Sequence, residues 1–296
     1  CLLSRGLGDV YKRQVQYANS SDNPSTAART VSFTVNDSAA NSNTVASTVN
    51  VIAVNDAPTL STGSTLNFTE NGAAAAINGA IVVADLDNTT LASATVAISG
   101  NFVAGQDVLA FTNVPATMGN ITASYNAATG VLTLSSAGNT ATVAQWQAAL
   151  RAVQYSNTSE DPSALVRTVS YTVNDAAANS NTVSSTINVA PVNDAPVNTL
   201  PAGFTTNEDT TVGLTGLQVS DVDAGSGNVR ITLSVPSGAL TATAGGGVTV
   251  TGSGTGTLVL EGSLTSINAY LASASRPNYV PVSYTHLRAH ETRGNL

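Results

Sequence analysis

The sequence predicts an all-β protein built from tandem antiparallel Greek-key β-sandwich modules, each with one short helix. Three observations predict this fold class: a long internal repeat, short stretches in which polar and apolar residues alternate, and Gly, Asn and Asp clusters between those stretches. Alternation places successive side chains on opposite faces of a strand, and the clusters favour turns. Short strands at intervals of about ten residues are typical of a sandwich.

The repeat sets the domain organisation. Residues 15–58 and 153–196 are identical at 31 of 44 positions, with no insertion or deletion. Both copies end in Val-Asn-Asp-Ala-Pro, where Pro stiffens the junction to the next module. Such a repeat indicates stacked modules. We therefore expect the C-terminal part of a first module at 15–58, a complete second module at 59–196 and the N-terminal part of a third at 197–280.

The strands are predicted by their period of two. Residues 30–35 read Thr-Val-Ser-Phe-Thr-Val, and their copy at 168–173 keeps the pattern. The other alternating stretches lie at 44–51, 182–189, 94–98, 121–125, 132–134 and 229–235.

One segment of each module has helical spacing instead. Val143, Trp146, Leu150 and Val153 recur at this spacing after Thr142, which is suited to cap a helix. Leu264, Ile267, Leu271 and Ala274 are the corresponding residues of the third module. Trp146 could be a sugar-stacking platform, but its place on the apolar stripe favours a core anchor.

Both ends of the chain differ from the interior. Half of all basic residues, both His and the single Cys lie in residues 1–14 and 281–296. These ends resemble strings found at the termini of predicted proteins from metagenomic assemblies, and they look like translated sequencing adapter. We exclude them from fold and function arguments.

The interior composition excludes several functions. Residues 15–280 hold 16 acidic residues and five Arg, and they contain neither Lys, His nor Cys. Ser-His-Asp and Cys-His catalysis and His or Cys zinc sites therefore cannot form there. A carboxylate pair of the glycosidase kind remains, but acids that recur at every junction do not mark a unique cleft. An acidic surface repels nucleic acid, and no apolar run is long enough to cross a membrane.

The acids recur at matching places in each module. Carboxylates gathered in this way repel one another unless a cation neutralises them, and Ca²⁺ accepts six to eight oxygen ligands from flexible loops. The alternative is that these Asp and Asn residues are solvated turn formers. The recurring positions are Asp37 and Asp175, Asn55-Asp56 and Asn193-Asp194, Glu70 and Glu208, Asp85-x-Asp87 and Asp221-x-Asp223.

The order Glu, Asp-x-Asp, Thr-Val-Asn-Asp and Val-Asn-Asp-Ala-Pro resembles cadherin-type repeats, and more closely the cadherin-like modules of large bacterial RTX-type adhesins. The resemblance covers nearly all of residues 15–280. It implies calcium between consecutive modules. By position, the first junction would use Asp37, Asn55, Asp56, Glu70, Asp85 and Asp87. The second would use Asp175, Asn193, Asp194, Glu208, Asp221 and Asp223.

Two departures from the cadherin pattern reduce the expected ion count or affinity. Ala53 and Pro191 lie where the cadherin linker has a further Asp, and no Leu-Asp-Arg-Glu motif follows residues 130–134.

The leading hypothesis is a non-catalytic spacer of an extracellular bacterial adhesin, found on a cell surface or in a biofilm. Its partners would be neighbouring modules of the chain and a host or biofilm glycan or protein. The alternatives are a carbohydrate- or receptor-binding module and an accessory domain of a secreted glycosidase. Tyr17 and Tyr155, and Phe33 and Tyr171, recur between the copies, which indicates packing. Tyr125 and Phe204 are exceptions that could bind a ligand.

Overall fold

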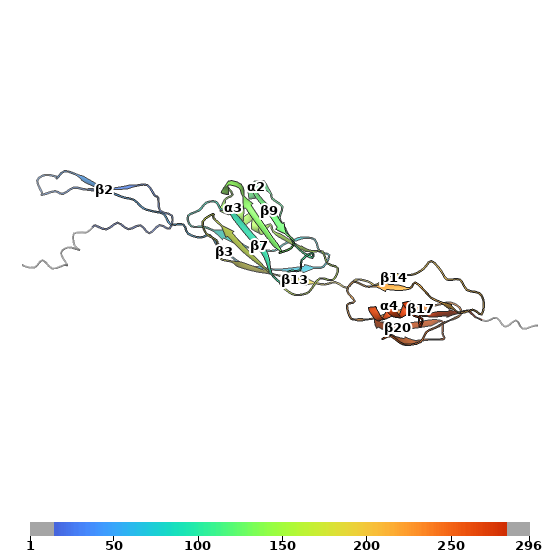
Figure 1. Ribbon diagram of the computed structural model, residues 1–296. Helices are drawn as coiled ribbons and strands as arrows, with labels where there is room; N and C mark the ends of the chain where they lie inside the picture. Colours follow the sequence, from blue (N-terminus) through green and yellow to red (C-terminus); the bar gives the residue numbers. More distant parts are fainter. Residues whose placement is uncertain (1–14, 283–296) are drawn as a thin grey trace, which may run out of the picture. The chain divides into compact units, whose positions relative to one another are not determined.

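The computed structural model describes residues 15–282 and divides into two compact units, one ending at Ala190 and one beginning at Pro191 (Figure 1). Strands dominate both units, so the all-β prediction is confirmed. The expectation that residues 1–14 and 281–296 are not native lies outside the described residues, apart from positions 281 and 282.

The first described element is a β-hairpin, hereafter the N-terminal hairpin. Its strands β1 (Arg29–Phe33) and β2 (Val45–Val49) are antiparallel, with Arg29 opposite Val49 and Phe33 opposite Val45. These residues match the alternating stretches of the first repeat copy. Most of their side chains are exposed.

Residues 59–190 form the central sandwich. Its larger sheet has six strands, and all of its pairings are antiparallel except that of β4 with β13, which is parallel. The predicted antiparallel sandwich therefore has one parallel pairing, at the edge of this sheet. The strand order is β4 (Thr65–Thr69), β13 (Val183–Ala190), β12 (Arg167–Asn174), β7 (Ser93–Gly100), β10 (Val131–Ser136) and β9 (Ile121–Asn126).

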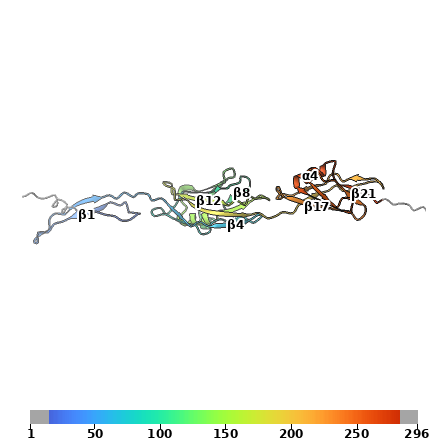
Figure 2. The ribbon, with the colours of Figure 1, turned by 90° about the horizontal axis from the view of Figure 1, so that it is seen from below.

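A smaller sheet forms the second layer (Figure 2). Side chains from both sheets enter one core, among them Val96 and Leu132 from the large sheet and Leu109 from the small one. The rings of Phe68 and Tyr155 meet edge to face across this core, 5.1 Å apart. The small sheet contains β5 (Ala75–Ala76), β11 (Gln154–Asn157) and β8 (Asp107–Ala110), and a separate pair joins β3 (Thr59–Ser61) to β6 (Val82–Ala84).

The predicted helix of the central sandwich is α3 (Val143–Arg151). Thr142 caps it in a reciprocal capping box with Gln145. Trp146 is fully buried, and its indole N–H donates to the Leu91 carbonyl at 3.0 Å. The core-anchor interpretation of Trp146 is therefore confirmed. A second helix that the sequence pattern did not predict, α2 (Pro115–Met118), is a single turn, and a 3-10 turn spans Ala137–Asn139.

A buried ion pair joins the two sheets of the central sandwich. Asp107 on β8 and Arg167 on β12 are both inaccessible, with Arg167 Nε 3.3 Å from Asp107 Oδ1. Tyr155 donates its hydroxyl to the same oxygen at 2.5 Å, and Arg167 Nη1 donates to the Ser163 and Leu165 carbonyls. Because an unpaired buried charge is costly, this network ties β12 to β8.

Residues 191–282 form the C-terminal sandwich, with a smaller core around Leu258 and Leu260. Helix α4 (Leu264–Ala272) confirms the second predicted helix, with Ser263 as its cap; Ala274 lies beyond its end. One sheet orders β17 (Asn228–Ser234), β20 (Thr257–Ser263) and β19 (Thr249–Thr251), and another orders β15 (Val212–Gly213), β21 (Asn278–Val280) and β18 (Ala239–Thr241). Strands β14 (Val197–Thr199) and β16 (Gln218–Ser220) form a pair.

Candidate metal centre

Strand pairing brings the first linker and the Asp-x-Asp segment together. Strand β3 begins directly after the linker, and β6 ends directly before Asp85. The two strands are antiparallel with Thr59 opposite Ala84, so residues 55–58 lie beside residues 85–87. The Asp56 backbone N–H donates to Asp87 Oδ2 at 3.1 Å.

Asp85 holds this segment in a tight turn. Its Oδ1 accepts the backbone N–H groups of Asp87 at 3.1 Å and Asn88 at 2.8 Å. Its Oδ2 is buried without a hydrogen-bond partner. Burial raises the pKa of Asp85, and the nearby Asp87 carboxylate adds to the increase.

Asp175 joins the same group from the end of β12. Asn55 Nδ2 donates to Asp175 Oδ2 at 2.8 Å, and Asn88 Nδ2 donates to Asn55 Oδ1 at 3.1 Å. Asp175 Oδ1 accepts the backbone N–H groups of Ala177 and Ala178. Burial acts to raise the pKa of Asp175, but the hydrogen bonds from Ala178, Asn55 and Ala177 together lower it.

The assignment of Asp175 to the second junction was wrong. Strand β13 runs antiparallel to β12, so the residue after β12 lies where β13 begins, at the end opposite the second linker. We call the resulting group the first-junction cluster: Asn55, Asp56, Asp85, Asp87, Asn88 and Asp175. Sequence reasoning missed Asn88, although it directly follows the Asp-x-Asp segment.

The first-junction cluster suits a hard divalent cation. The hydrogen bonds to its four carboxylates come from backbone N–H groups and Asn amides, which carry no net charge. The cluster contains no Arg that could neutralise these carboxylates. Carboxylate and amide oxygens are the ligands that Ca²⁺ accepts, and the unpartnered Asp85 Oδ2 is available to one.

The C-terminal sandwich repeats the arrangement in its own linker. The Asp194 backbone N–H donates to Asp223 Oδ2 at 2.8 Å, as that of Asp56 does to Asp87. Asp221 Oδ1 accepts the N–H groups of Asp223 and Ala224 at 3.3 and 3.1 Å. We call Asn193, Asp194, Asp221 and Asp223 the second-junction cluster.

The second-junction cluster also contains two interacting carboxyl groups. The hydrogen bond with Asp223 raises the pKa of Asp221, while the same hydrogen bond and the Asp194 N–H lower that of Asp223. One carboxyl therefore holds a proton more readily than the other, as expected for two like charges without a cation.

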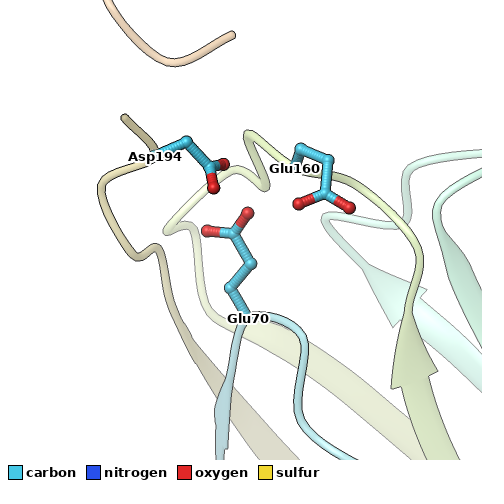
Figure 3. Close-up of side chains that lie close together, drawn as sticks. All are labelled: Glu70, Glu160 and Asp194. Carbon is cyan, nitrogen blue, oxygen red and sulfur yellow. The ribbon is translucent and has the colours of Figure 1, made fainter. Parts of the chain in front are cut away.

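Glu70 lies at the end of the central sandwich opposite the first-junction cluster. Strand β4 is parallel to β13, so their C-terminal ends coincide, and the Glu70 N–H donates to the Ala190 carbonyl at 3.0 Å. Its assignment to the first junction was therefore wrong. Figure 3 shows its carboxylate facing that of Glu160, and the two offer oxygens within 4.8 Å of each other.

Glu160 was missed by the sequence analysis. It lies in the loop between β11 and β12, where Asn71 Nδ2 donates to its Oε2 at 3.0 Å. Its counterpart in the first repeat copy is Asp22, so an acid stands at this position in both copies. That recurrence was the available signal. Asp194, also labelled in Figure 3, belongs to the unit that begins at Pro191.

Two further predicted ligands lie apart from these groups. Asp37 follows β1 in an antiparallel hairpin, so it lies at the end away from the linker at 50–58. Hydrogen bonds from the Ala40 and Ala39 backbones lower its pKa. Glu208 is exposed in the loop before β15, and the hydrogen bonds described for the second-junction cluster do not include it.

The two aromatic candidates for ligand binding differ in their surroundings. Tyr125 is half-buried and donates its hydroxyl to the Asp107 carbonyl at 2.8 Å, which is a packing role. Phe204 is 39% exposed and lines a cavity of about 350 Å³ in the C-terminal sandwich, together with Val212, Leu214, Val235, Pro236 and Tyr279.

Comparisons with known proteins give one relative by sequence and several by fold. No family model matches the chain. Halomucin of Haloquadratum walsbyi is 38% identical over 104 residues, which are 34% of this chain and 1% of halomucin. The chain thus spans a very small part of that protein.

The similar solved structures are cadherin fragments. They include human CDH23 EC21-23 (TM-score 0.29, 17% identity, 79% of this chain and 65% of that one). Another is protocadherin gamma B2 domains 1-5 (TM-score 0.28, 14% identity, 74% of this chain and 35% of that one). A third is mouse cadherin-23 EC22-24 (TM-score 0.29, 14% identity, 80% of this chain and 64% of that one). At such identities and TM-scores, these structures say nothing about the function of this chain. Among the described residues, no helix has the length and apolarity needed to span a membrane.

Proposed function

We propose that the chain is a non-catalytic spacer segment of an extracellular adhesive protein, with calcium ions that stiffen the junctions between its modules. One observation carries the proposal. The same hydrogen-bond pattern, from a linker Asp backbone to the second Asp of an Asp-x-Asp turn, occurs at both junctions. In each case it gathers carboxylates that no basic side chain of the cluster neutralises.

At the first junction, the ion would be held by carboxylates that the fold already brings together. Asp85, Asp87 and Asp175 come from two separated segments of the central sandwich, and Asp56 comes from the linker. An ion bound by all of them would tie the linker to the sandwich. It would also offset the cost of burying Asp85, whose raised pKa reports that cost.

At the other end of the central sandwich, Glu70 and Glu160 form the start of a second ligand set. The Glu70 backbone N–H donates to the Ala190 carbonyl, so this pair of acids lies at the C-terminal end of β13.

The extracellular setting follows from the ion. Exposed junction sites of this kind belong to the weak extracellular class, with Kd of roughly 10⁻⁴–10⁻³ M. Such sites fill where calcium is millimolar and stay empty inside a cell. Calcium would then do the stapling that disulfides do in other secreted proteins, since residues 15–280 contain no Cys. The 104 residues that match halomucin are only 1% of that protein, which supports a segment of a much longer extracellular protein.

Calcium titration by calorimetry tests the proposal on the full 296-residue chain. Asp87→Asn and Asp223→Asn each remove one carboxylate from one cluster. We expect each variant to weaken binding at its own cluster roughly tenfold or more and to leave the other cluster unchanged. Glu261→Gln, at an exposed position on β20 outside both clusters, is the matched control. Heats of binding that are absent from the wild type, or equal in all variants, would refute the proposal.

A further inference from the structure

Strands β6 and β16 each have one edge that bonds to a helix instead of a further strand. In the central sandwich, the Val83 N–H donates to Gln147 Oε1 on α3 at 3.2 Å. In the C-terminal sandwich, the Val219 N–H donates to Asn268 Oδ1 on α4 at 3.0 Å, and Asn268 Nδ2 donates to the Val219 carbonyl at 2.7 Å. Each helix has nine residues, with Gln147 and Asn268 both in fifth place. The two edges therefore correspond residue by residue.

The two edges differ at the last residue of the helix. Arg151 ends α3, and its Nε donates to the Ile81 carbonyl, directly before β6, at 2.9 Å. The corresponding residue at the end of α4 is Ala272, and the corresponding carbonyl, directly before β16, is that of Leu217. The C-terminal sandwich therefore keeps the backbone acceptor but lacks the side chain that occupies it in the central sandwich.

A cavity takes the place of this missing side chain. Alternate residues of an extended segment direct their backbone groups to the same side, so Leu217 faces α4 as Val219 does. Within residues 15–282, no hydrogen bond reaches the Leu217 carbonyl. The cavity has a volume of about 240 Å³ and is lined by Gly216, Leu217, Gln218, Asn268, Leu271 and Ala272.

The strands that complete a sandwich do not cover this edge. In the central sandwich, the loop after β12 reaches the other strand of the pair, where Asn181 bonds the N–H and the carbonyl of Leu60 on β3 at 2.8 and 2.9 Å. Leu60 lies opposite Val83, so Asn181 and Gln147 flank the β3–β6 pair on opposite sides. A counterpart of Asn181 would lie beside β14. The cavity beside β16 is therefore a property of residues 216–272.

The surroundings of the cavity favour a cation with several N–H donors. The last turn of α4 contains no basic residue, whereas that of α3 contains Arg151, and the carbonyl end of a helix carries a partial negative charge. Residues 191–282 contain six acidic residues and two Arg, and an acidic unit attracts cations. A guanidinium group keeps its charge and offers five N–H donors in one plane. It is also the group that bonds the equivalent edge of the central sandwich.

We propose that this cavity binds the guanidinium group of an Arg side chain or of a free alkylguanidinium compound. The Leu217 carbonyl accepts one of its N–H groups, as the Ile81 carbonyl does from Arg151. The alkyl stem packs on Leu271 and Ala272. The site shares no residue with the second-junction cluster, so a partner that presents an Arg attaches there without calcium.

Amide chemical shifts of the full chain in chelator test the site. N-acetyl-arginine amide represents an Arg side chain of a partner, and ethylguanidinium represents a free compound. We expect saturable shifts at residues 216–219 and 268–272 with Kd of roughly 1–10 mM. Either order of affinity supports a guanidinium site: tighter binding of the arginine amide indicates a partner's side chain, and equal binding indicates free compounds. N-acetyl-citrulline amide has a similar shape without the charge and should bind roughly tenfold more weakly.

Two variants exchange the occupant between the sandwiches. Ala272→Arg fills the cavity with the chain's own side chain and should weaken binding roughly tenfold or more. Arg151→Ala opens the equivalent cavity, so a second set of shifts should appear at residues 80–83 and 147–151, and ethylguanidinium should restore part of the lost unfolding midpoint. Arg230→Ala, at an exposed Arg outside both edges, is the control and should gain no site. Wild-type shifts that do not saturate, or that persist unchanged in Ala272→Arg, would overturn the proposal.

Discussion

At the residue scale, Asp85 links the geometry of the first junction to its chemistry. One carboxylate oxygen shapes the turn by accepting two backbone N–H groups, and the other is buried without a partner. An Asn side chain keeps the accepting oxygen and replaces the other by an uncharged NH₂ group. Asp85→Asn therefore separates the structural role of this residue from its charge.

We predict that Asp85→Asn has opposite effects with and without calcium. The folded-state pKa of Asp85 is raised above 3.8, so ionisation destabilises the ion-free fold as the pH rises through and above that value. In chelator at neutral pH, the variant should therefore unfold at a higher temperature than the wild type. In calcium it should unfold at a lower temperature, because a ligand is missing. Thermal unfolding followed by circular dichroism measures both.

Glu261→Gln, at an exposed position on β20 outside both clusters, is the control for this comparison and should behave like the wild type in both conditions. The account of Asp85 fails if the variant is destabilised in chelator. Asp175 acts in a different pH window: its pKa is lowered, so its contribution is present above 3.8 and is lost on further acidification.

At the scale of elements, strand direction decides which acids meet. The alternating pattern predicted the strands because each has one buried and one exposed face, as β12 and β13 do. The alternation of polar and apolar residues does not predict in which direction or in which order the strands lie in a sheet. Asp175 precedes the second linker closely in sequence, yet β13 runs the full length of the sheet between them.

Glu70 illustrates the same limit. The parallel pairing of β4 with β13 places it beside Ala190 at the C-terminal end of β13, and nothing in the local sequence distinguishes a parallel neighbour from an antiparallel one. The sequence analysis grouped the Asn-Asp segment with the Asp-x-Asp segment, and the structure places them side by side. The reason is that β3 directly follows the first segment, β6 directly precedes the second, and these two strands pair. Glu160 and Asn88 were missed because the resemblance to cadherins draws attention only to the acids of its own motif.

Helix α3 supplies a prediction at this scale. Its N-terminus rests on the reciprocal hydrogen bonds of Thr142 and Gln145, at 3.3 and 2.8 Å. Thr142→Ala removes one of them and should lower the free energy of unfolding of the central sandwich by about 1 kcal/mol. Thr142→Ser keeps the hydroxyl and should cost little. Urea unfolding measures both, and equal losses in the two variants would contradict a capping role.

At the scale of the whole molecule, the two junction clusters are copies of one arrangement. The linker Asp, the Asp-x-Asp turn and the linker Asn recur with the same hydrogen bonds in separate compact units. A tandem protein needs its modules to be similar and its junctions to be defined. Repetition of the same hydrogen bonds at each junction supports the proposed spacer.

The most direct test of the calcium-stiffened spacer is the unfolding midpoint of the full chain in calcium and in chelator at equal ionic strength. An ion present at 10–100 times its Kd stabilises its site by about 1.4–2.7 kcal/mol, so we expect calcium to raise the midpoint by several degrees. Magnesium should raise it much less, because its strict octahedral geometry suits these loops poorly. An identical midpoint in calcium and in chelator would contradict the account.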